Sequence, residues 1–345
     1  MKKILLPFTV VLFGVVSGQD LHYSLYTMAP LNVNPALTGN FNGDLRVINN
    51  FRQQWSTIST AYMTYSLGID MPLERKDKRK PSPDFFAVGY NMNMDRTGIN
   101  AIRNYQFNGT FSYNKSFDGL GATFVSLGGV FGFTQRSINI QSASWDSQWN
   151  GIAYDGALST GETLLTDDTY FYLDGGIGAA FTSTKYERIK FSGGMSALHL
   201  NRPEVCFLGG TDWLQIRYSA HLNTQIRIGT DTETWIYPNA MFVSQGPARM
   251  LNVGIAVKNR LTERSIYTNY ATEKSITIGT MYRLEDAVSA YIRLDIGPIG
   301  AAFNYDFNIS KLTVVSKGKG AMEFMLIYTG LYKDKNTRMS KPVFL

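Results

Sequence analysis

Apolar and polar residues alternate at every second position over many separate stretches of this chain. The clearest stretch runs from Ile216 to Ile228, where one face is mostly apolar and the other carries arginine, serine, histidine, asparagine and glutamine. Successive side chains of a β-strand point to opposite faces of the sheet, so this stretch predicts a strand with one apolar and one strongly polar side.

Counting such stretches predicts about fourteen antiparallel strands of about ten residues each, an even number within the range known for membrane barrels. The strands are expected to start near Asp44, Ala61, Phe85, Asn104, Ala122, Tyr170, Arg188, Gln215, Thr234, Met250, Lys274, Ala287, Ile299 and Ala321. The segments near Ala122 and Thr234 alternate poorly, and Pro238 interrupts the second of them.

Alternation alone leaves two architectures open. A soluble β-sandwich would turn its apolar faces inward, whereas a membrane barrel turns them to lipid and lines its lumen with the polar faces. Strands of about ten residues suit a tilted membrane crossing. Aromatic residues near strand ends, as in an interfacial belt, are Tyr105, Tyr113, Tyr282 and Tyr328. We therefore predict an all-β fold, a single transmembrane β-barrel over residues 44–330.

Residues 1–18 have the composition of a secretory signal peptide. Lys2 and Lys3 precede a mostly apolar stretch from Ile4 to Val16, and small residues precede a cleavage point at Gly18. The apolar stretch is too short to span a bilayer, which takes about 20 such residues. We therefore expect export and a location in the outer membrane.

Residues 19–43 precede the first predicted strand and contain many large apolar side chains. Pro30 and Pro35 exclude a regular helix or strand through them. A flexible tail would be poorer in large apolar residues. We expect this segment to form a plug in the barrel lumen or against its periplasmic mouth, and residues 331–345 to form a C-terminal tail.

Connection lengths predict which end of the barrel faces outward. The longest strand-poor stretch, Ile138 to Thr169, would lie outside the cell if both termini are periplasmic. The charged run from Glu74 to Lys80 would then face the periplasm, as a solvated turn or as a docking surface for an acidic partner. The connection from Asn259 to Glu273 would also be periplasmic, and it is longer than expected there.

Composition excludes several other classes of protein. No stretch after the first 18 residues is apolar enough for a transmembrane helix. The net charge of +6 is modest and the basic residues are mostly scattered, so nucleic-acid binding is not indicated. Cys206 is the only cysteine, so no disulfide can form within the chain.

The sequence contains no recognisable catalytic, metal-binding or cofactor-binding arrangement. Its three histidines, His22, His199 and His221, have no metal-ligand spacing with one another or with Cys206. His221 falls on a polar strand face and is expected to be a hydrogen-bonded lumen residue.

Charged residues on the predicted lumen faces are expected to form a ladder that satisfies a polar interior, rather than an acid–base pair for catalysis. They are Asp174, Asp295, Asp306, Arg217, Arg227, Arg283 and Arg293. Glycine pairs inside strands mark bends or close approaches of other groups. They are Gly128-Gly129, Gly175-Gly176 and Gly193-Gly194.

Two regions carry short motifs in a fixed order. The first contains Met28-Ala29-Pro30, the run from Asn34 to Gly39, Phe41 to Asp44, Arg46, and the run from Phe51 to Trp55. The second runs from Tyr305 to Leu312. In residue types, order and spacing the chain resembles the PorP/SprF family of Bacteroidetes membrane proteins.

The resemblance implies an outer-membrane barrel of the type IX secretion system and gliding motility machinery. Such a barrel exports or anchors secreted surface proteins that bear a particular class of C-terminal domain, and it contacts periplasmic secretion-machinery proteins. Many members end in a Cys-Pro tail, whereas this chain ends in the run from Lys341 to Leu345, so the resemblance does not extend to contacts of that tail.

The residues with an expected role in partner interaction or in docking an ordered N-terminal element are Asn34, Pro35, Ala36, Thr38, Gly39, Arg52, Trp55, Tyr305 and Asp306. The simpler interpretation of the Asn-Pro and Thr-Gly pairs is that they only make turns. Two other functions stay open at this point: a passive porin-like channel for small solutes, and a soluble β-sandwich enzyme or lectin.

Overall fold

The computed structural model describes residues 20–56, 60–73, 83–98, 102–118, 121–139, 146–159, 169–206, 212–229, 233–262, 273–311 and 313–330. The predicted signal peptide, the charged run from Glu74 to Lys80, and the tail from residue 331 lie outside these residues.

Fifteen strands form one antiparallel sheet in the described part of the chain. They are β1 (Leu45–Gln54), β2 (Tyr62–Leu73), β3 (Phe85–Thr97), β4 (Ile102–Ser116), β5 (Thr123–Ser137), β6 (Thr169–Ser183), β7 (Ile189–Leu198), β8 (Arg217–Ile228), β9 (Thr234–Ile236), β10 (Asn239–Gln245), β11 (Ala248–Thr262), β12 (Lys274–Arg283), β13 (Ala287–Ile296), β14 (Ile299–Asn308) and β15 (Lys319–Gly330).

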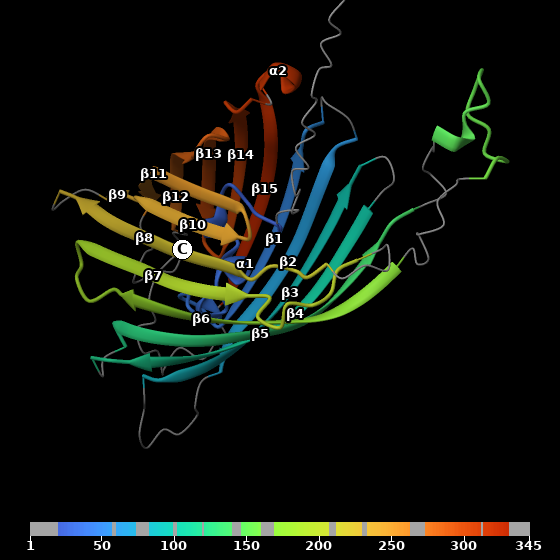
Figure 1. The fold of residues 1–345 in the computed structure, drawn as a ribbon. Helices are drawn as coiled ribbons and strands as arrows, with labels where there is room; N and C mark the ends of the chain where they lie inside the picture. Colours follow the sequence, from blue (N-terminus) through green and yellow to red (C-terminus); the bar gives the residue numbers. More distant parts are fainter. Residues whose placement is uncertain are drawn as a thin grey trace, which may run out of the picture.

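The sheet closes into a barrel (Figure 1). The last strand, β15, pairs with β1, and β8 pairs with β10, which continues into β11. Strands β9 and β10 are two halves of one barrel position, separated by Tyr237 and Pro238. Proline lacks the N–H that a ladder needs, yet Thr224 N still donates to Pro238 O at 2.9 Å. The barrel therefore has fourteen strand positions, which confirms the predicted number.

The observed strand starts differ from the predicted ones by at most two residues. Strand β5 forms despite its poor alternation, because glycines replace larger side chains along it: Gly128, Gly129 and Gly132. A Cβ atom at any of these three positions would lie within 2.5 Å of a neighbouring atom. Strand β11 extends to Thr262, so the connection expected from Asn259 begins only after Thr262.

Burial shows which face of the sheet meets lipid. On β3 the side chain of Phe86 is 62% exposed, whereas those of Asn91 and Asn93 are 3% and 2% exposed. A soluble sandwich would show the reverse, so the apolar faces point outward to the membrane and the polar faces point into the lumen. Among the described residues, no helix has the length and hydropathy needed to cross a bilayer.

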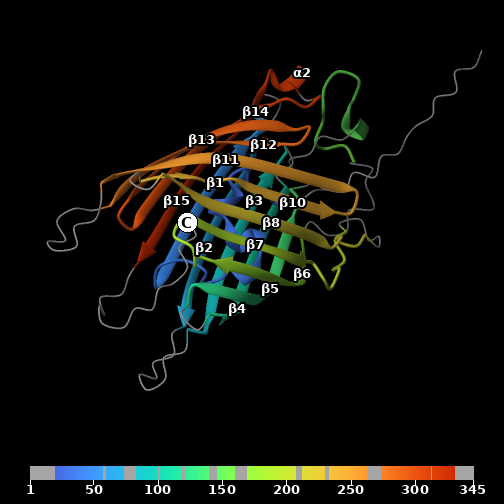
Figure 2. The same ribbon diagram turned by 90° about the vertical axis from the view of Figure 1, so that its left-hand side faces the viewer.

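Residues 20–43, which we call the enclosed segment, lie inside the ring of strands (Figures 1 and 2). They form three short helical turns: η1 (Tyr26–Met28), α1 (Pro30–Val33) and η2 (Pro35–Leu37). Two further short helices, η4 (Asp146–Gln148) and α2 (Thr313–Ser316), lie in connections between strands.

The enclosed segment extends between the two ends of the barrel. We call the end where β1 begins and β15 ends the base, and the opposite end, which carries the β5–β6 connection, the rim. Asp20 N donates to Gln245 at the rim (3.1 Å), whereas Asp44 N donates to Gly330 O at the base (2.9 Å). The segment therefore spans the lumen and is not confined to the mouth at the base.

A charge placed on the outer face should be costly if that face meets lipid. Leu222 lies near the middle of β8 with its side chain 52% exposed. We expect Leu222→Arg to lower the unfolding free energy in lipid vesicles by about 2–4 kcal/mol, compared with Leu222→Ala. Denaturant titration of both variants measures this difference. Equal stabilities would show that Leu222 faces water.

Candidate functional site

A group of buried charges holds the first part of the enclosed segment at the level of Ser24. The backbone N–H of Ser24 donates to Glu323 Oε1 at 2.7 Å, and that of Leu25 donates to Glu323 Oε2 at 3.1 Å. The Ser24 hydroxyl donates to Asp306 Oδ2 at 2.6 Å. The same hydroxyl accepts hydrogen bonds from Arg52 and Arg283, each at 2.8 Å.

The charges around Ser24 balance one another. Arg52 forms ion pairs with Glu323 and with Asp306, and Arg283 Nη2 lies 3.1 Å from Asp306 Oδ2. The side chains of Arg52, Asp306 and Glu323 are at most 2% exposed. Buried charges are tolerated when they are paired and fully hydrogen-bonded. Because Ser24 completes this network, the buried ion pairs of the wall and the position of the enclosed segment stabilise each other.

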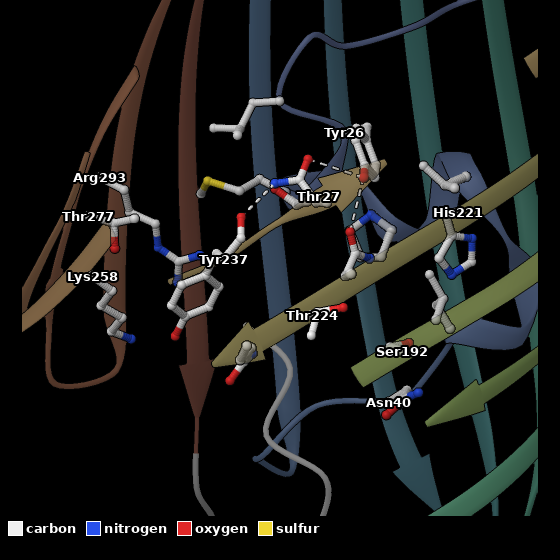
Figure 3. A pocket seen from close by; sticks show the side chains of 18 of the residues that line it. Tyr26, Thr27, Asn40, Ser192, His221, Thr224, Tyr237, Lys258, Thr277 and Arg293 are labelled. Carbon is white, nitrogen blue, oxygen red and sulfur yellow. Dashed lines mark hydrogen bonds between the residues drawn. The ribbon is translucent and has the colours of Figure 1, made fainter. Parts of the chain in front are cut away.

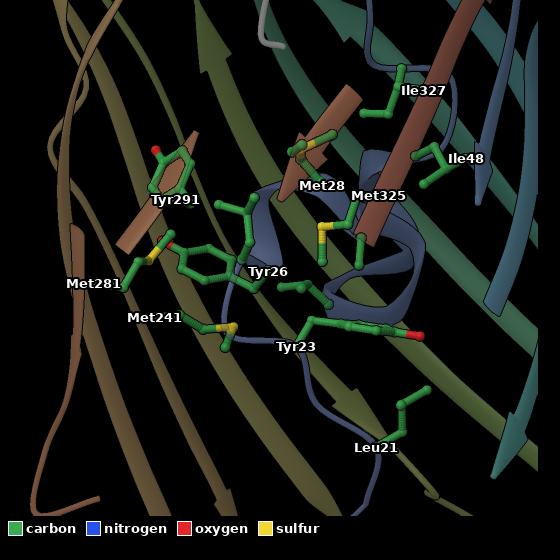
Figure 4. Close-up of a cluster of buried hydrophobic side chains, with 14 of the residues drawn as sticks. Leu21, Tyr23, Tyr26, Met28, Ile48, Met241, Met281, Tyr291, Met325 and Ile327 are labelled. Carbon is green, nitrogen blue, oxygen red and sulfur yellow. The ribbon is translucent and has the colours of Figure 1, made fainter. Parts of the chain in front are cut away.

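Apolar packing supports the same part of the segment (Figure 4). Buried side chains of Leu21, Tyr23, Tyr26 and Met28 contact apolar residues of the barrel wall. Those wall residues include Ile48, Met241, Met281, Tyr291, Met325 and Ile327. The predicted excess of large apolar residues in the segment is thus explained by burial inside the barrel.

The Asn34-Pro35-Ala36 turn packs against glycines of β5 and β6. The Asn34 amide donates to Ala179 O at 3.0 Å and to Met195 O at 3.1 Å, and its Oδ1 accepts from Ala36 N at 2.9 Å. A Cβ atom on Gly178 would lie 2.0 Å from Asn34 Oδ1, and one on Gly128 would lie 2.5 Å from Ala36 N. The turn therefore fits only because these wall positions have no side chain.

Thr38 and Gly39 tie the last part of the segment to the wall near the base. Thr38 Oγ1 donates to Thr110 Oγ1 at 3.0 Å, and Gly39 N donates to Asp70 Oδ2 at 2.7 Å. Asp70 also accepts two hydrogen bonds from Arg46, at 2.8 and 2.7 Å. Gly39 has a φ of 71°, and a Cβ there would lie 2.3 Å from Ala87 Cβ. Glycine is required by both the backbone and the space.

The rim end of the segment is held by a third polar group. Asp20 Oδ2 lies 3.0 Å from His199 Nε2 and 3.1 Å from Arg217 Nη1, and His199 Nδ1 lies 2.6 Å from Asp174 Oδ2. Burial by itself lowers the pKa of His199, but the hydrogen bonds to Asp174 and Asp20 outweigh it and raise the pKa to about 9. His199 is therefore cationic at neutral pH and links two carboxylates.

The structure brings together seven of the nine predicted site residues, at two levels of the lumen. Arg52 and Asp306 lie at the Ser24 network, and Asn34, Pro35, Ala36, Thr38 and Gly39 lie towards the base. Trp55 lies at the rim, 38% exposed, with its ring 6.5 Å from that of Tyr62. Tyr305 lies on the outer face, where its ring packs 4.8 Å from that of Phe307.

The charged residues predicted to line the lumen pair only partly with one another. Within the predicted set, Asp306 pairs with Arg283 and Asp295 with Arg293, whereas Arg217 pairs with Asp20 and Arg227 with Glu233, which were not in the set. The expectation of a hydrogen-bonded His221 is wrong: in the described part of the chain neither ring nitrogen has a partner.

Sequence reasoning missed Ser24 and Glu323. Glu323 was detectable because it interrupts an otherwise apolar strand on its inward face. Ser24 carried no signal, since a serine contacts such a network only once the segment is folded inside the barrel. No group of three or more histidine, cysteine, aspartate or glutamate residues in the described ranges is placed to hold a metal ion.

Comparison with known proteins decides the family. The model of the family described as type IX secretion system membrane protein PorP/SprF matches residues 15–328. The chain belongs to the PorP/SprF family. Members of this family are membrane proteins of a secretion system and not enzymes. No curated protein matches the chain.

Solved structures resemble this PorP/SprF protein in fold. The toluene transporter TbuX of Ralstonia pickettii has a TM-score of 0.50 at 10% identity, covering 88% of this chain and 94% of its own. The monoaromatic hydrocarbon channel CymD has a TM-score of 0.47 at 10% identity, covering 89% of this chain and 93% of its own. The TbuX likeness supports the fourteen-stranded barrel fold. A barrel of this kind in a family of type IX secretion system membrane proteins is an outer-membrane protein.

Removing one charge from the Ser24 network should destabilise the whole barrel. We expect Arg52→Met to lower the unfolding free energy by about 3–5 kcal/mol, because Asp306 and Glu323 lose a buried partner. Denaturant titration in lipid vesicles measures this. Arg103→Met, which removes an exposed arginine of β4, is the matched control. Equal losses of unfolding free energy in the two variants would contradict the structural role of Arg52.

The His199 contacts predict a pH dependence. A pKa raised on folding from the ordinary value of 6.5 to about 9 stabilises the fold fully below pH 6.5, and this contribution is lost as the pH rises through 9. We expect the stability difference between the wild-type protein and His199→Gln to shrink between pH 6.5 and 10. A difference that grows with pH would contradict these contacts.

Proposed function

We propose that this PorP/SprF protein holds or passes a secreted surface protein, or its C-terminal domain, and contacts periplasmic secretion-machinery proteins. Membership of a type IX secretion family supports this role. In this proposal the chain works without a cofactor. Residues 1–18 are its signal peptide and residues 44–330 form its barrel. The enclosed segment acts as a plug of that barrel, and residues 331–345 form a C-terminal tail.

The observation that carries the proposal is the enclosed segment, which spans the lumen and is tied to the wall at three levels. Its ties are made at Asp20, at Ser24 and over Asn34 to Gly39. A barrel filled in this way is poorly suited to rapid passage of solutes. We further propose that the base is periplasmic, which places the rim and its β5–β6 connection outside the cell.

The alternative, a porin-like channel for small solutes, has two observations in its favour. Cavities remain on both sides of the enclosed segment, one facing the rim beside Arg52 and Trp55 and one facing the base beside Lys258. The similar proteins TbuX and CymD are described as a transporter and a channel for aromatic compounds.

Liposome swelling separates these two functions. We expect the wild-type protein to admit small sugars slowly. Gly128→Val should speed their entry, because a side chain there meets the backbone of Pro35 and Ala36 at 2.5 Å. Gly109→Val is the matched control, since a Cβ at Gly109 has its nearest neighbour at 3.7 Å. Fast entry through the wild-type barrel would favour the channel.

Co-purification tests the partners directly. We expect wild-type protein extracted in mild detergent to retain a secreted surface protein or a periplasmic component, identified by mass spectrometry. Cells that carry only Gly128→Val should retain less of it and display less secreted protein, whereas cells with Gly109→Val should match the wild type. Recovery of the bare barrel from all three strains would contradict the proposed role.

A further inference from the structure

A cavity lies between the enclosed segment and the inner wall of β7 to β13 (Figure 3). The space inside it that water-sized groups can occupy is about 110 Å³, and the volume is about 970 Å³ when the open mouth is counted. The enclosed segment contributes an apolar side that includes Leu25, Tyr26, Met28 and Val33. The barrel wall contributes mostly polar side chains. The cavity is therefore amphipathic.

A cationic row lies at one end of the cavity. In the strand register Lys258 of β11 stands opposite Thr277 of β12, which stands opposite Arg293 of β13. Side chains in such a row lie on one face of the sheet, about 5 Å apart. All three residues line the cavity. The side chains of Lys258 and Arg293 are sheltered from water, at 18% and 14% exposed.

Among the described residues, one carboxylate, that of Asp295, lies within ion-pair distance of the cationic row. Arg293 binds Asp295 Oδ1 at 2.8 Å, while Lys258 Nζ lies 3.8 Å from Asp295 Oδ2, beyond hydrogen-bond distance. This is the only polar contact of Lys258 among the described residues. The nearby Arg227 and Arg260 are balanced by Glu233 and Glu273. Counted over the described part of these strands, one positive charge therefore remains available to an anion.

An unpartnered polar group faces the other end of the cavity. His221 is 5% exposed, its ring nitrogens have no hydrogen-bond partner in the described ranges, and its side chain lines the cavity (Figure 3). Between the two ends lie the rings of Tyr26 and Tyr237. The Tyr26 hydroxyl is already bound by Asn223 and Asn239, at 3.0 and 3.3 Å, so its ring is fixed in place.

We propose that this cavity binds a small amphipathic carboxylate. The carboxylate lies against Lys258 and Arg293 and gives Lys258 the hydrogen bond that it lacks. The apolar body follows Tyr237 and Tyr26 and ends near His221. This site does not depend on the proposed secretion role, because it rests on the cavity and its charges alone.

Calorimetry on the full chain in lipid nanodiscs tests the charge requirement. The probe is 3-phenylpropionate, and its uncharged match is 3-phenylpropan-1-ol, with empty nanodiscs as the blank. A hydrogen bond to a charged group contributes about 1.5–3 kcal/mol, so the carboxylate should bind at least about tenfold more tightly than the alcohol. Lys258→Met should remove this preference, whereas Lys319→Met, which removes an exposed lysine at the rim end of β15, should keep it.

Imidazole NMR locates the bound probe, because the sequence contains only three histidines. Their signals are assigned with single His→Gln variants. Binding of 3-phenylpropionate should shift the His221 signal and leave that of His199, at the rim, unchanged. Equal affinity for acid and alcohol, or an unshifted His221 signal, or full binding by Lys258→Met would each overturn the site. A failed secretion assay would not affect these results.

Discussion

The carboxylates of Asp306 and Glu323 determine what can fill this barrel. Each lies on an inward strand face, is at most 1% exposed, and cannot stay ionised there without donors. Arg52 and Arg283 supply the charge, and Ser24 with the Leu25 N–H supplies the remaining hydrogen bonds. The wall thus balances its own buried charges, and the enclosed segment completes their hydrogen bonds.

The rest of the architecture follows from that constraint. A wall that accepts a folded segment must have room for it, and Gly128 and Gly178 provide room beside the Asn34-Pro35-Ala36 turn. The segment then carries its large apolar side chains into the lumen, where they pack against methionines of the wall. The space left towards the base keeps Lys258 and His221 without full partners, and this is where a ligand would fit.

The sequence predicted the barrel well because alternation is a local property. Strand starts and the inward position of residues such as Asp306 and Arg283 follow from a period of two, and the family motifs marked Asn34 to Gly39. Contacts across the lumen could not be predicted from the sequence, because they join distant residues: Ser24 binds Glu323, which lies 299 positions further along the chain. The unpartnered state of His221 likewise depends on the neighbours that the fold places around its ring, which no pattern in its own strand encodes. Trp55 and Tyr305 share motifs with Arg52 and Asp306, but they lie at the rim and on the outer face.

Hydrogen exchange of the enclosed segment in lipid bilayers tests the central claim most directly. The amides of Ser24, Leu25, Ala36 and Gly39 donate to buried side chains. Our account predicts that they exchange as slowly as amides in the middle of β1 and β15. Exchange within seconds, at the rate of an open chain, would show that the segment does not stay in the lumen.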